Sequence, residues 1–200
     1  MAMLSGLDRM AKWLMRSGDV LFPGSRASYS WLATHVSGRV LDVGCSFGTG
    51  TALIASQHVR TVGIDVDFGS VHMARGLYPW LDWWMWDISK APICQTPEYD
   101  YVIGVESFEH IRDQRSAMKN MLRAAGLEVI ITTPNPAYTG GQSGCPEHTH
   151  EFEPKELSEL VRSLGATITH IYEVGTFKEV TDASKSPDLM YVISRAGGVA

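Results

Sequence analysis

Short apolar runs alternate with segments of helical apolar spacing over most of this 200-residue chain. This alternation predicts parallel strands joined by crossover helices. The last two apolar runs have no helical pattern between them and should pair antiparallel. We therefore expect an α/β fold with a doubly wound, seven-stranded, mostly parallel sheet and helices on both faces. The predicted strands cover residues 39–43, 60–64, 81–86, 99–105, 128–132, 166–172 and 188–194, and the predicted helices between them residues 50–57, 69–76, 114–125 and 154–164.

Length and composition predict one ordinary globular domain over residues 1–200. Domains commonly hold ~100–200 residues. The hydrophobic fraction of 44% and the charged fraction of 20% are close to the average for globular chains. Helical spacing of apolar residues near the start predicts that residues 1–36 form a helical segment packed on the domain. A glycine-rich stretch within residues 134–153 predicts a loop on the substrate side.

The net charge of −5 and the three cysteines indicate which classes of partner and which cellular compartment to expect. An acidic balance does not favour a polyanion over the whole surface, so DNA is not expected as a partner, while RNA stays open. Asp8, Arg9 and Lys12 interrupt the apolar N-terminus, so no membrane association is expected. An odd number of cysteines without C-x-x-C spacing predicts a reduced, cytoplasmic protein.

The segment around the end of the first predicted strand carries the strongest signal for a ligand. Residues 40–50 read VLDVGCSFGTG, which predicts an apolar strand, a glycine-rich turn and the start of a helix. In open parallel sheets, ligands bind at the carboxyl ends of the strands, where this turn lies. Glycines let the backbone turn tightly and approach a ligand closely. The residues predicted to contact the ligand here are Asp42, Gly44, Cys45, Ser46, Gly48 and Gly50.

Asp42 and the glycine spacing favour S-adenosylmethionine (SAM) over a dinucleotide. A dinucleotide turn requires G-x-G-x-x-G, whereas a match started at Gly44 places Ser46 and Thr49 at the second and third glycines. A carboxylate beside the turn would repel a pyrophosphate. The same carboxylate could hold the ammonium group of SAM, which also carries a sulfonium.

Further predicted cofactor contacts follow the second and third strands. Asp65 comes 23 residues after Asp42, and an acid ~20 residues past such a turn can accept hydrogen bonds from both ribose hydroxyls. Val66 follows it directly and is grouped with the cofactor-binding residues. Asp87 ends the third strand, where it could accept from the adenine amino group, and Ile88 could offer its backbone N–H to the ring.

Together these features resemble the class I SAM-dependent methyltransferases over nearly the whole chain. Residues 40–50 are similar to the family's first motif, with Ser46 where many members carry a middle glycine. The resemblance implies a Rossmann-like sheet of seven strands with an antiparallel last hairpin, which agrees with the strand pattern above. It also implies SAM as the cofactor and methyl transfer as the reaction.

A second cluster follows the fourth predicted strand. Glu106, Glu109 and His110 have i, i+3, i+4 spacing, so on a helical turn they would share one face. His148 and His150 come later, after the glycine-rich stretch. Carboxylates together with imidazoles suit a fairly hard divalent cation, Mg²⁺ or Mn²⁺ before Zn²⁺. Alternatively, the acids stabilise a helix N-terminus, and His110 or His150 acts as a general base without a metal.

The E-x-x-E-H pattern also resembles two methyltransferase subgroups, the metal-dependent small-RNA terminal 2′-O-methyltransferases and the ubiquinone-type O-methyltransferases. In the RNA subgroup, T-P-N follows the fifth strand and a histidine stands shortly before F-E, as residues 133–135 and His150 do here. This resemblance implies a set of four metal ligands and catalytic residues. They are Glu106, Glu109, His110 and His150, with His148 as the substitute for His150 and Glu106 also touching the cofactor.

The cluster favours transfer to oxygen. An aliphatic hydroxyl is a poor nucleophile at neutral pH, so a metal or a neighbouring base would lower the barrier. We expect a SAM-dependent methyltransferase that modifies a hydroxyl of a small molecule or a saccharide. Two alternatives stay open: 2′-O-methylation of the terminal ribose of an RNA, and a catalytically silent SAM-binding partner subunit.

Overall fold

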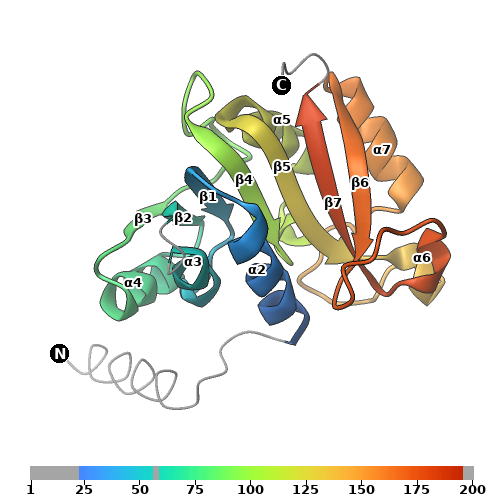
Figure 1. Ribbon diagram of the computed structural model, residues 1–200, viewed down its shortest axis with the longest axis horizontal. Helices are drawn as coiled ribbons and strands as arrows, with labels where there is room; N and C mark the ends of the chain where they lie inside the picture. The colour runs from blue at the N-terminus through green and yellow to red at the C-terminus, as the bar shows by residue number, and fades with distance from the viewer. Residues whose placement is uncertain (1–22, 56–58, 196–200) are drawn as a thin grey trace.

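The computed structural model describes residues 23–55 and 59–195 and contains a seven-stranded sheet with helices on both faces (Figure 1). The order of the strands is β3-β2-β1-β4-β5-β7-β6. β7 runs antiparallel to β5 and β6, and the other neighbouring pairs are parallel. The predicted fold class is therefore confirmed. The strands are β1 Arg39–Val43, β2 Arg60–Asp65, β3 Asp82–Met85, β4 Tyr99–Val105, β5 Ala125–Pro134, β6 Ala166–Glu173 and β7 Asp188–Arg195.

The helices also follow the predicted pattern, with two short additions. They are α2 Pro23–His35, α3 Thr49–Ala55, α4 Phe68–Leu77, η1 Phe108–His110, α5 Gln114–Ala124, α6 Pro136–Thr139, α7 Pro154–Ser163 and η2 Ala183–Lys185. The helix expected before residue 23 lies outside the described residues. α6 and η2 were not predicted, because a single turn is too short to show apolar periodicity. No helix in the described parts of the chain is long and apolar enough to cross a membrane.

The helices form one layer on each face of the sheet. α2 and α3 pack on one face through Tyr29, Leu32 and Ile54, and Figure 1 shows α4 beside them. α5 and α7 cover the other face with Met118, Met121, Leu157 and Val161, each at most 1% exposed. Both faces of the central strands are thus buried, which explains why β1 and β4 read as nearly continuous apolar runs.

The chain changes direction across the sheet between β1 and β4. From β1 the chain proceeds through β2 to β3 at one edge, and β4 then lies on the other side of β1. In open α/β sheets, the crevice at the carboxyl ends of the two strands at this switch point is the usual place for a ligand. Here the β1–α3 turn and the segment between β4 and η1 meet at that point, since the Ser107 hydroxyl donates to the Val43 carbonyl at 2.8 Å.

Candidate functional site

The turn after β1 has the tight geometry that its glycines permit. Gly44 and Gly48 have φ angles of +75° and +81°, in the left-handed region that favours glycine. Ser46 also has a positive φ, at 49°, which is uncommon for a residue with a side chain. The N–H groups of Gly44 and Cys45 both donate to the Ile64 carbonyl, at 2.8 and 3.0 Å, and tie the turn to β2.

Protein side chains fill the space that the missing side chains of these glycines leave. A Cβ on Gly44 would lie 2.5 Å from Ser107 Cβ, and one on Gly48 would lie 2.4 Å from the Trp83 ring. A Cβ on Gly50 would lie 2.2 Å from the Tyr29 ring. Close packing of the turn against Ser107, Trp83 and Tyr29 therefore by itself requires glycine at these three positions. The missing side chains let α2, β3 and the β4 end pack closely around the turn.

Asp42 lies behind the turn rather than in the crevice. Its side chain is fully buried, and it accepts hydrogen bonds from the Tyr29 hydroxyl at 3.1 Å and the Thr51 hydroxyl at 2.6 Å. Burial raises the pKa of Asp42 to about 7, against the opposing effect of these hydrogen bonds. Direct contact with a ligand ammonium needs an exposed carboxylate oxygen, which Asp42 does not present here, and its hydrogen bonds make Asp42 an anchor of the turn.

Asp65 is placed where the cofactor prediction requires it. It ends β2 and is partly exposed. Its carboxylate accepts the N–H groups of Ser46 and Asp67, both at 2.9 Å, so it holds the β1 turn and the start of α4 in place. Each carboxylate oxygen can accept a further bond, which leaves capacity for ligand hydroxyls. Val66 follows with 65% of its surface exposed and offers an apolar surface beside the carboxylate.

Asp87 and Ile88 follow β3, as predicted, and differ in what they can offer. The Asp87 carboxylate is partly exposed, accepts the N–H and hydroxyl of Ser89, and pairs with Lys90 at 3.2 Å. Ile88 is 3% exposed, and its carbonyl accepts a hydrogen bond from the Asn120 amide at 2.7 Å. A ligand at this strand end would thus meet a carboxylate whose position is fixed by its own loop.

Glu106 stands at the end of β4 in a strained backbone conformation. Its φ is +49°, the same value as at Ser46 in the neighbouring turn. Its N–H donates to the carbonyl and the hydroxyl of Thr132, at 3.2 and 3.0 Å. Strained residues of this kind cluster at functional sites. Ser46 and Glu106 both lie at the switch point of the sheet, and their strained conformations support this crevice as the functional site.

Glu109 is a buried acid with an unused oxygen. It lies in η1 with 1% of its surface exposed. Within residues 23–55 and 59–195, neither Glu109 Oε2 nor Glu106 Oε1 has a hydrogen-bond partner. Burial raises the pKa of Glu109 to about 8, and the nearby Glu106 charge acts in the same direction. Burial likewise raises the pKa of Glu106 to about 7. Unpartnered buried carboxylate oxygens are costly and need a proton or a cation.

Two imidazoles complete this cluster. One ligand atom from each of Glu109, His110 and His148 lies within 4.8 Å of the others. The His110 and His148 rings meet edge to face with centroids 4.7 Å apart. His110 Nδ1 contacts the Glu147 carbonyl at 3.1 Å, and His148 Nδ1 contacts a Glu151 oxygen at 2.5 Å. In a neutral imidazole, a proton on Nδ1 that faces such an acceptor leaves the lone pair on Nε2.

The structure does not bring His150, the expected fourth ligand, into the group formed by Glu109, His110 and His148. His150 Nε2 contacts both carboxylate oxygens of Glu156 at 2.9 Å, and its ring packs edge to face on Phe152. His148, the predicted substitute, takes the place beside Glu109 instead. Glu106 is not part of the group whose ligand atoms lie within 4.8 Å of one another. Because Glu106 precedes η1, Glu106, Glu109 and His110 do not share the face of one helical turn.

The segment that carries His148 is fastened directly to η1. Thr149 donates its N–H and its hydroxyl to the Glu109 carbonyl, at 2.8 and 2.9 Å. The Gln114 amide donates to the Phe108 and His150 carbonyls, at 3.0 and 2.8 Å. Sequence reasoning missed Thr149 and Gln114, because their contacts join residues 40 and 36 positions apart and have no local sequence signal. It missed Glu151 because the contacts of Glu151 with His148 and Ser143 follow from the fold of the loop and from no regular spacing.

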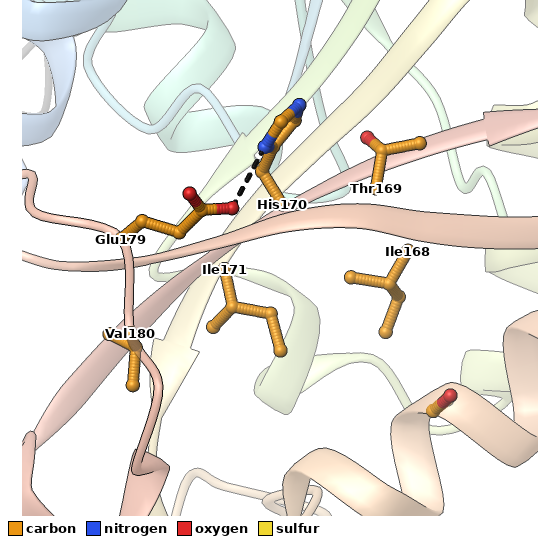
Figure 2. Close-up of a pocket in the computed structure, with 7 residues that line it drawn as sticks. Ile168, Thr169, His170, Ile171, Glu179 and Val180 are labelled. Atoms are coloured by element: carbon orange, nitrogen blue, oxygen red, sulfur yellow. Dashed lines mark hydrogen bonds and ion pairs between the residues drawn. The ribbon is translucent and has the colours of Figure 1, made fainter.

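A groove of 270 Å³ lies elsewhere, at the outer edge of the sheet (Figure 2). The groove is lined by residues 168–171 of β6, by Glu179 and Val180 in the segment after it and by Ser158 of α7, and Glu179 pairs with His170 at 3.1 Å. None of the predicted site residues lines it. The groove also lies on β6, the edge strand of the sheet, several strands from the switch point. We therefore do not assign the candidate site to it.

Comparisons with known proteins agree with the geometry. Residues 40–126 match a family described as a methyltransferase domain. Over 143 residues the chain is 31% identical to a probable S-adenosylmethionine-dependent methyltransferase of Mycolicibacterium smegmatis, covering 68% of this chain and 55% of that protein. It is 29% identical over 145 residues to a ubiquinone biosynthesis O-methyltransferase of Hahella chejuensis, covering 62% and 61%.

Solved structures share the fold. A TehB-like SAM-dependent methyltransferase from Corynebacterium glutamicum superposes with a TM-score of 0.71 at 20% identity, over 97% of this chain and 98% of that one. At this identity the match concerns the fold. The chain spans about half the length of the first curated relatives that it matches.

Proposed function

We propose that this chain, which matches a methyltransferase-domain family over residues 40–126 and shares the fold of solved SAM-dependent methyltransferases, is a SAM-dependent methyltransferase that methylates a hydroxyl oxygen of a small molecule or a saccharide. The methyl group passes from the SAM sulfonium to the hydroxyl oxygen, and S-adenosylhomocysteine and one proton are released. The crevice at the ends of β1, β2 and β4 is the proposed site of this transfer. Asp65, Val66, Asp87 and Ile88 lie on its adenosine side.

One observation carries the choice of oxygen as the acceptor atom. After the end of β4, Glu109 Oε2 is buried with no hydrogen-bond partner among the described residues, beside two histidines whose Nδ1 atoms face acceptor oxygens. This group is suited to removing or stabilising a proton at a hydroxyl, which the sulfonium alone cannot do. The chain's own groups for accepting that proton are His148 Nε2 and His110 Nε2.

The same group fits a divalent cation. Glu109, His110 and His148 offer one carboxylate and two imidazole ligands within 4.8 Å, and the buried Glu106 oxygen adds negative charge nearby. We propose Mg²⁺ or Mn²⁺ as the ion, since water and a substrate oxygen would fill the remaining positions. When bound, such an ion lowers the pKa of the acceptor hydroxyl.

The relatives support a small-molecule acceptor. Two of them are named ubiquinone biosynthesis O-methyltransferases, from Hahella chejuensis and Stutzerimonas stutzeri. The net charge of −5 also favours a small acceptor over a polyanion such as RNA. Methylation of an RNA terminal ribose, or a silent SAM-binding subunit, would appear as distinct outcomes of the test below.

The test supplies the purified chain with SAM labelled on the methyl group and two acceptor pools. One pool contains catechols, phenols and sugars, and the other contains short RNA with a free 3′ end. Each reaction is run with Mg²⁺, with Mn²⁺ and with a chelator. The variants are Glu109→Gln and, as a matched control, Glu179→Gln, which removes an exposed acid in the outer groove.

We expect label in the small-molecule pool, dependent on the ion and reduced by roughly 10²-fold or more in Glu109→Gln. Glu179→Gln should behave like the wild type. Label in RNA instead would replace the proposed acceptor. Activity that survives both the chelator and Glu109→Gln would overturn metal assistance, and SAM binding without label in either pool would favour the silent subunit.

A further inference from the structure

Glu151 is a buried carboxylate whose two oxygens are both bonded to the proposed site and its loop. Its side chain is 1% exposed. Oε1 contacts His148 Nδ1 at 2.5 Å and also accepts the Ser143 hydroxyl. Oε2 accepts the Ser143 N–H at 2.8 Å. A carboxylate accepts hydrogen bonds only, so these contacts specify a donor at each partner.

The contact with His148 determines which ring nitrogen is available. A neutral imidazole carries one proton, and a carboxylate opposite Nδ1 places that proton on Nδ1. Nε2 then keeps its lone pair for the group formed with Glu109 and His110. In sites of this type, such a carboxylate also fixes the orientation of the ring and increases its strength as a ligand.

The backbone of Glu151 fastens the loop as well. Its N–H donates to Gln142 Oε1 and its carbonyl accepts from Gln142 Nε2, both at 2.8 Å. Gln142 and Ser143 belong to the glycine-rich stretch after α6, where Gly140, Gly141 and Gly144 all have positive φ angles. One residue therefore holds both the loop and the imidazole.

We propose that Glu151 is a positioning residue. It holds His148 in the tautomer with the proton on Nδ1, and it couples this orientation of the ring to the position that residues 142–143 have in the structure. This inference rests on the proposed function, because it takes His148 as a member of the site. Loop position and an available Nε2 are then parts of one arrangement. Loss of the carboxylate should disturb both, whereas loss of a neighbouring exposed acid should disturb neither.

Glu151→Gln gives a sharp test because an amide has a single acceptor oxygen. That oxygen can accept from His148 Nδ1–H or from the Ser143 N–H, while the NH₂ group opposes the other donor. The tautomer is read from the ring ¹⁵N shifts of labelled, metal-free protein at about pH 8, above the ordinary pKa of imidazole. Hydrogen exchange of the Ser143 amide reports the loop. Glu156→Gln, which removes the acid paired with His150, is the matched control.

In the wild type we expect the proton of His148 on Nδ1. In Glu151→Gln we expect a change of this tautomer, faster exchange at Ser143, or both, with Glu156→Gln leaving both unchanged. A wild-type proton on Nε2 would overturn the proposal whether or not the variant folds, and so would a folded Glu151→Gln protein with both signals unchanged.

A second readout separates this proposal from the proposed function. Binding of Mn²⁺ alone, followed by its electron paramagnetic resonance signal, should weaken by roughly 10–100-fold in Glu151→Gln. If the wild type binds no Mn²⁺, the metal assistance of the proposed function fails, while the tautomer and the Ser143 exchange still decide the role of Glu151. If Mn²⁺ binds both proteins equally and neither the tautomer nor the Ser143 exchange changes, the role of Glu151 fails by itself.

Discussion

The Tyr29 hydroxyl donates to both carboxylate oxygens of Asp42 at 3.1 Å, and this contact joins α2 to the end of β1. Thr51 of α3 donates to the same carboxylate at 2.6 Å. Asp42 therefore connects three elements from the side of the turn that faces the core. The crevice side of the turn is formed by Ser46 and by the carboxylate of Asp65, which accepts the Ser46 N–H.

We expect Asp65→Ala to weaken binding of S-adenosylhomocysteine much more than Asp42→Asn does. Asp65 is the partly exposed acid at the end of β2, whereas Asn at position 42 can still accept the hydroxyl bonds behind the turn. Isothermal titration calorimetry should show a loss of roughly 10-fold or more for Asp65→Ala and a change of only a few fold for Asp42→Asn. The reverse order would mean that Asp42 contacts the ligand directly.

The buried carboxyl of Asp42 should make stability depend on pH. Burial raises its pKa from 3.8 to about 7 in the folded protein. The folded state then binds more protons between about pH 4 and 7, so the contribution of Asp42 to stability is complete below this window and is lost as the pH rises through it. Asp42→Asn removes this dependence.

The measurement is urea unfolding of the wild type and Asp42→Asn at several pH values. The stability of the variant relative to the wild type should rise by roughly 2–4 kcal/mol between about pH 4 and 8, since one pKa unit corresponds to ~1.4 kcal/mol. A constant difference between the two proteins across this range would show that Asp42 has an ordinary pKa in the folded state.

The positions of the strands and the antiparallel last hairpin could be predicted from the sequence because they depend on local patterns. Apolar runs locate the strands, and the absence of a helix before residue 188 predicts the antiparallel hairpin that β6 and β7 form. The glycine-rich turn predicts the switch point. These signals are contained within about ten residues each, so they need no knowledge of tertiary contacts.

The distant contacts of the site could not be predicted in this way. His148 and His150 are the two immediate neighbours of Thr149, and nothing in the sequence shows which ring turns toward Glu109. In the structure, Glu151 pairs with His148 and Glu156 pairs with His150, and these two contacts fix the positions of the rings. Similarly, Asp42 reads as an accessible acid until Tyr29, 13 residues earlier, is placed over the turn.

Gly50→Ala should destabilise the protein, although Ala is the better helix former. Its Cβ would lie 2.2 Å from the Tyr29 ring, and overpacking of this kind costs ~1–3 kcal/mol or more. Gly76→Ala is the matched control, since Gly76 is an exposed residue of α4 with nothing within 4 Å of the new Cβ. That substitution should stabilise by ~0.5–1 kcal/mol. Thermal unfolding of both variants measures these changes in stability. An equal change in the two variants would contradict the packing of the Tyr29 ring against Gly50.

His148→Ala and His150→Ala should differ in their binding of Mn²⁺. His148 lies in the group with Glu109 and His110, while His150 is paired with Glu156. Titration of Mn²⁺ should show a loss of roughly 10–100-fold for His148→Ala and little change for His150→Ala. A larger loss of Mn²⁺ affinity for His150→Ala would favour the ligand set expected from the sequence, in which His150 is the fourth ligand.

The affinity for Mn²⁺ should also rise with pH. Burial raises the pKa of Glu106 to about 7 and that of Glu109 to about 8. Because a ligand must lose its proton before it binds a metal, the ion competes with protons over this range. Affinity measured in Glu109→Gln should be lower and should depend less on pH between about 6 and 8. An equal pH dependence in both proteins would remove Glu109 from the ligand set.

The most direct measurement is a crystal structure of the chain grown with S-adenosylhomocysteine and Mn²⁺, with diffraction data collected to reveal the anomalous signal of manganese. We predict the nucleoside beside Asp65 and an anomalous peak bounded by Glu109, His110 and His148. A nucleoside at the switch point with no peak at these residues, or a peak held by His150 and Glu156, would contradict the proposed methyl-transfer site.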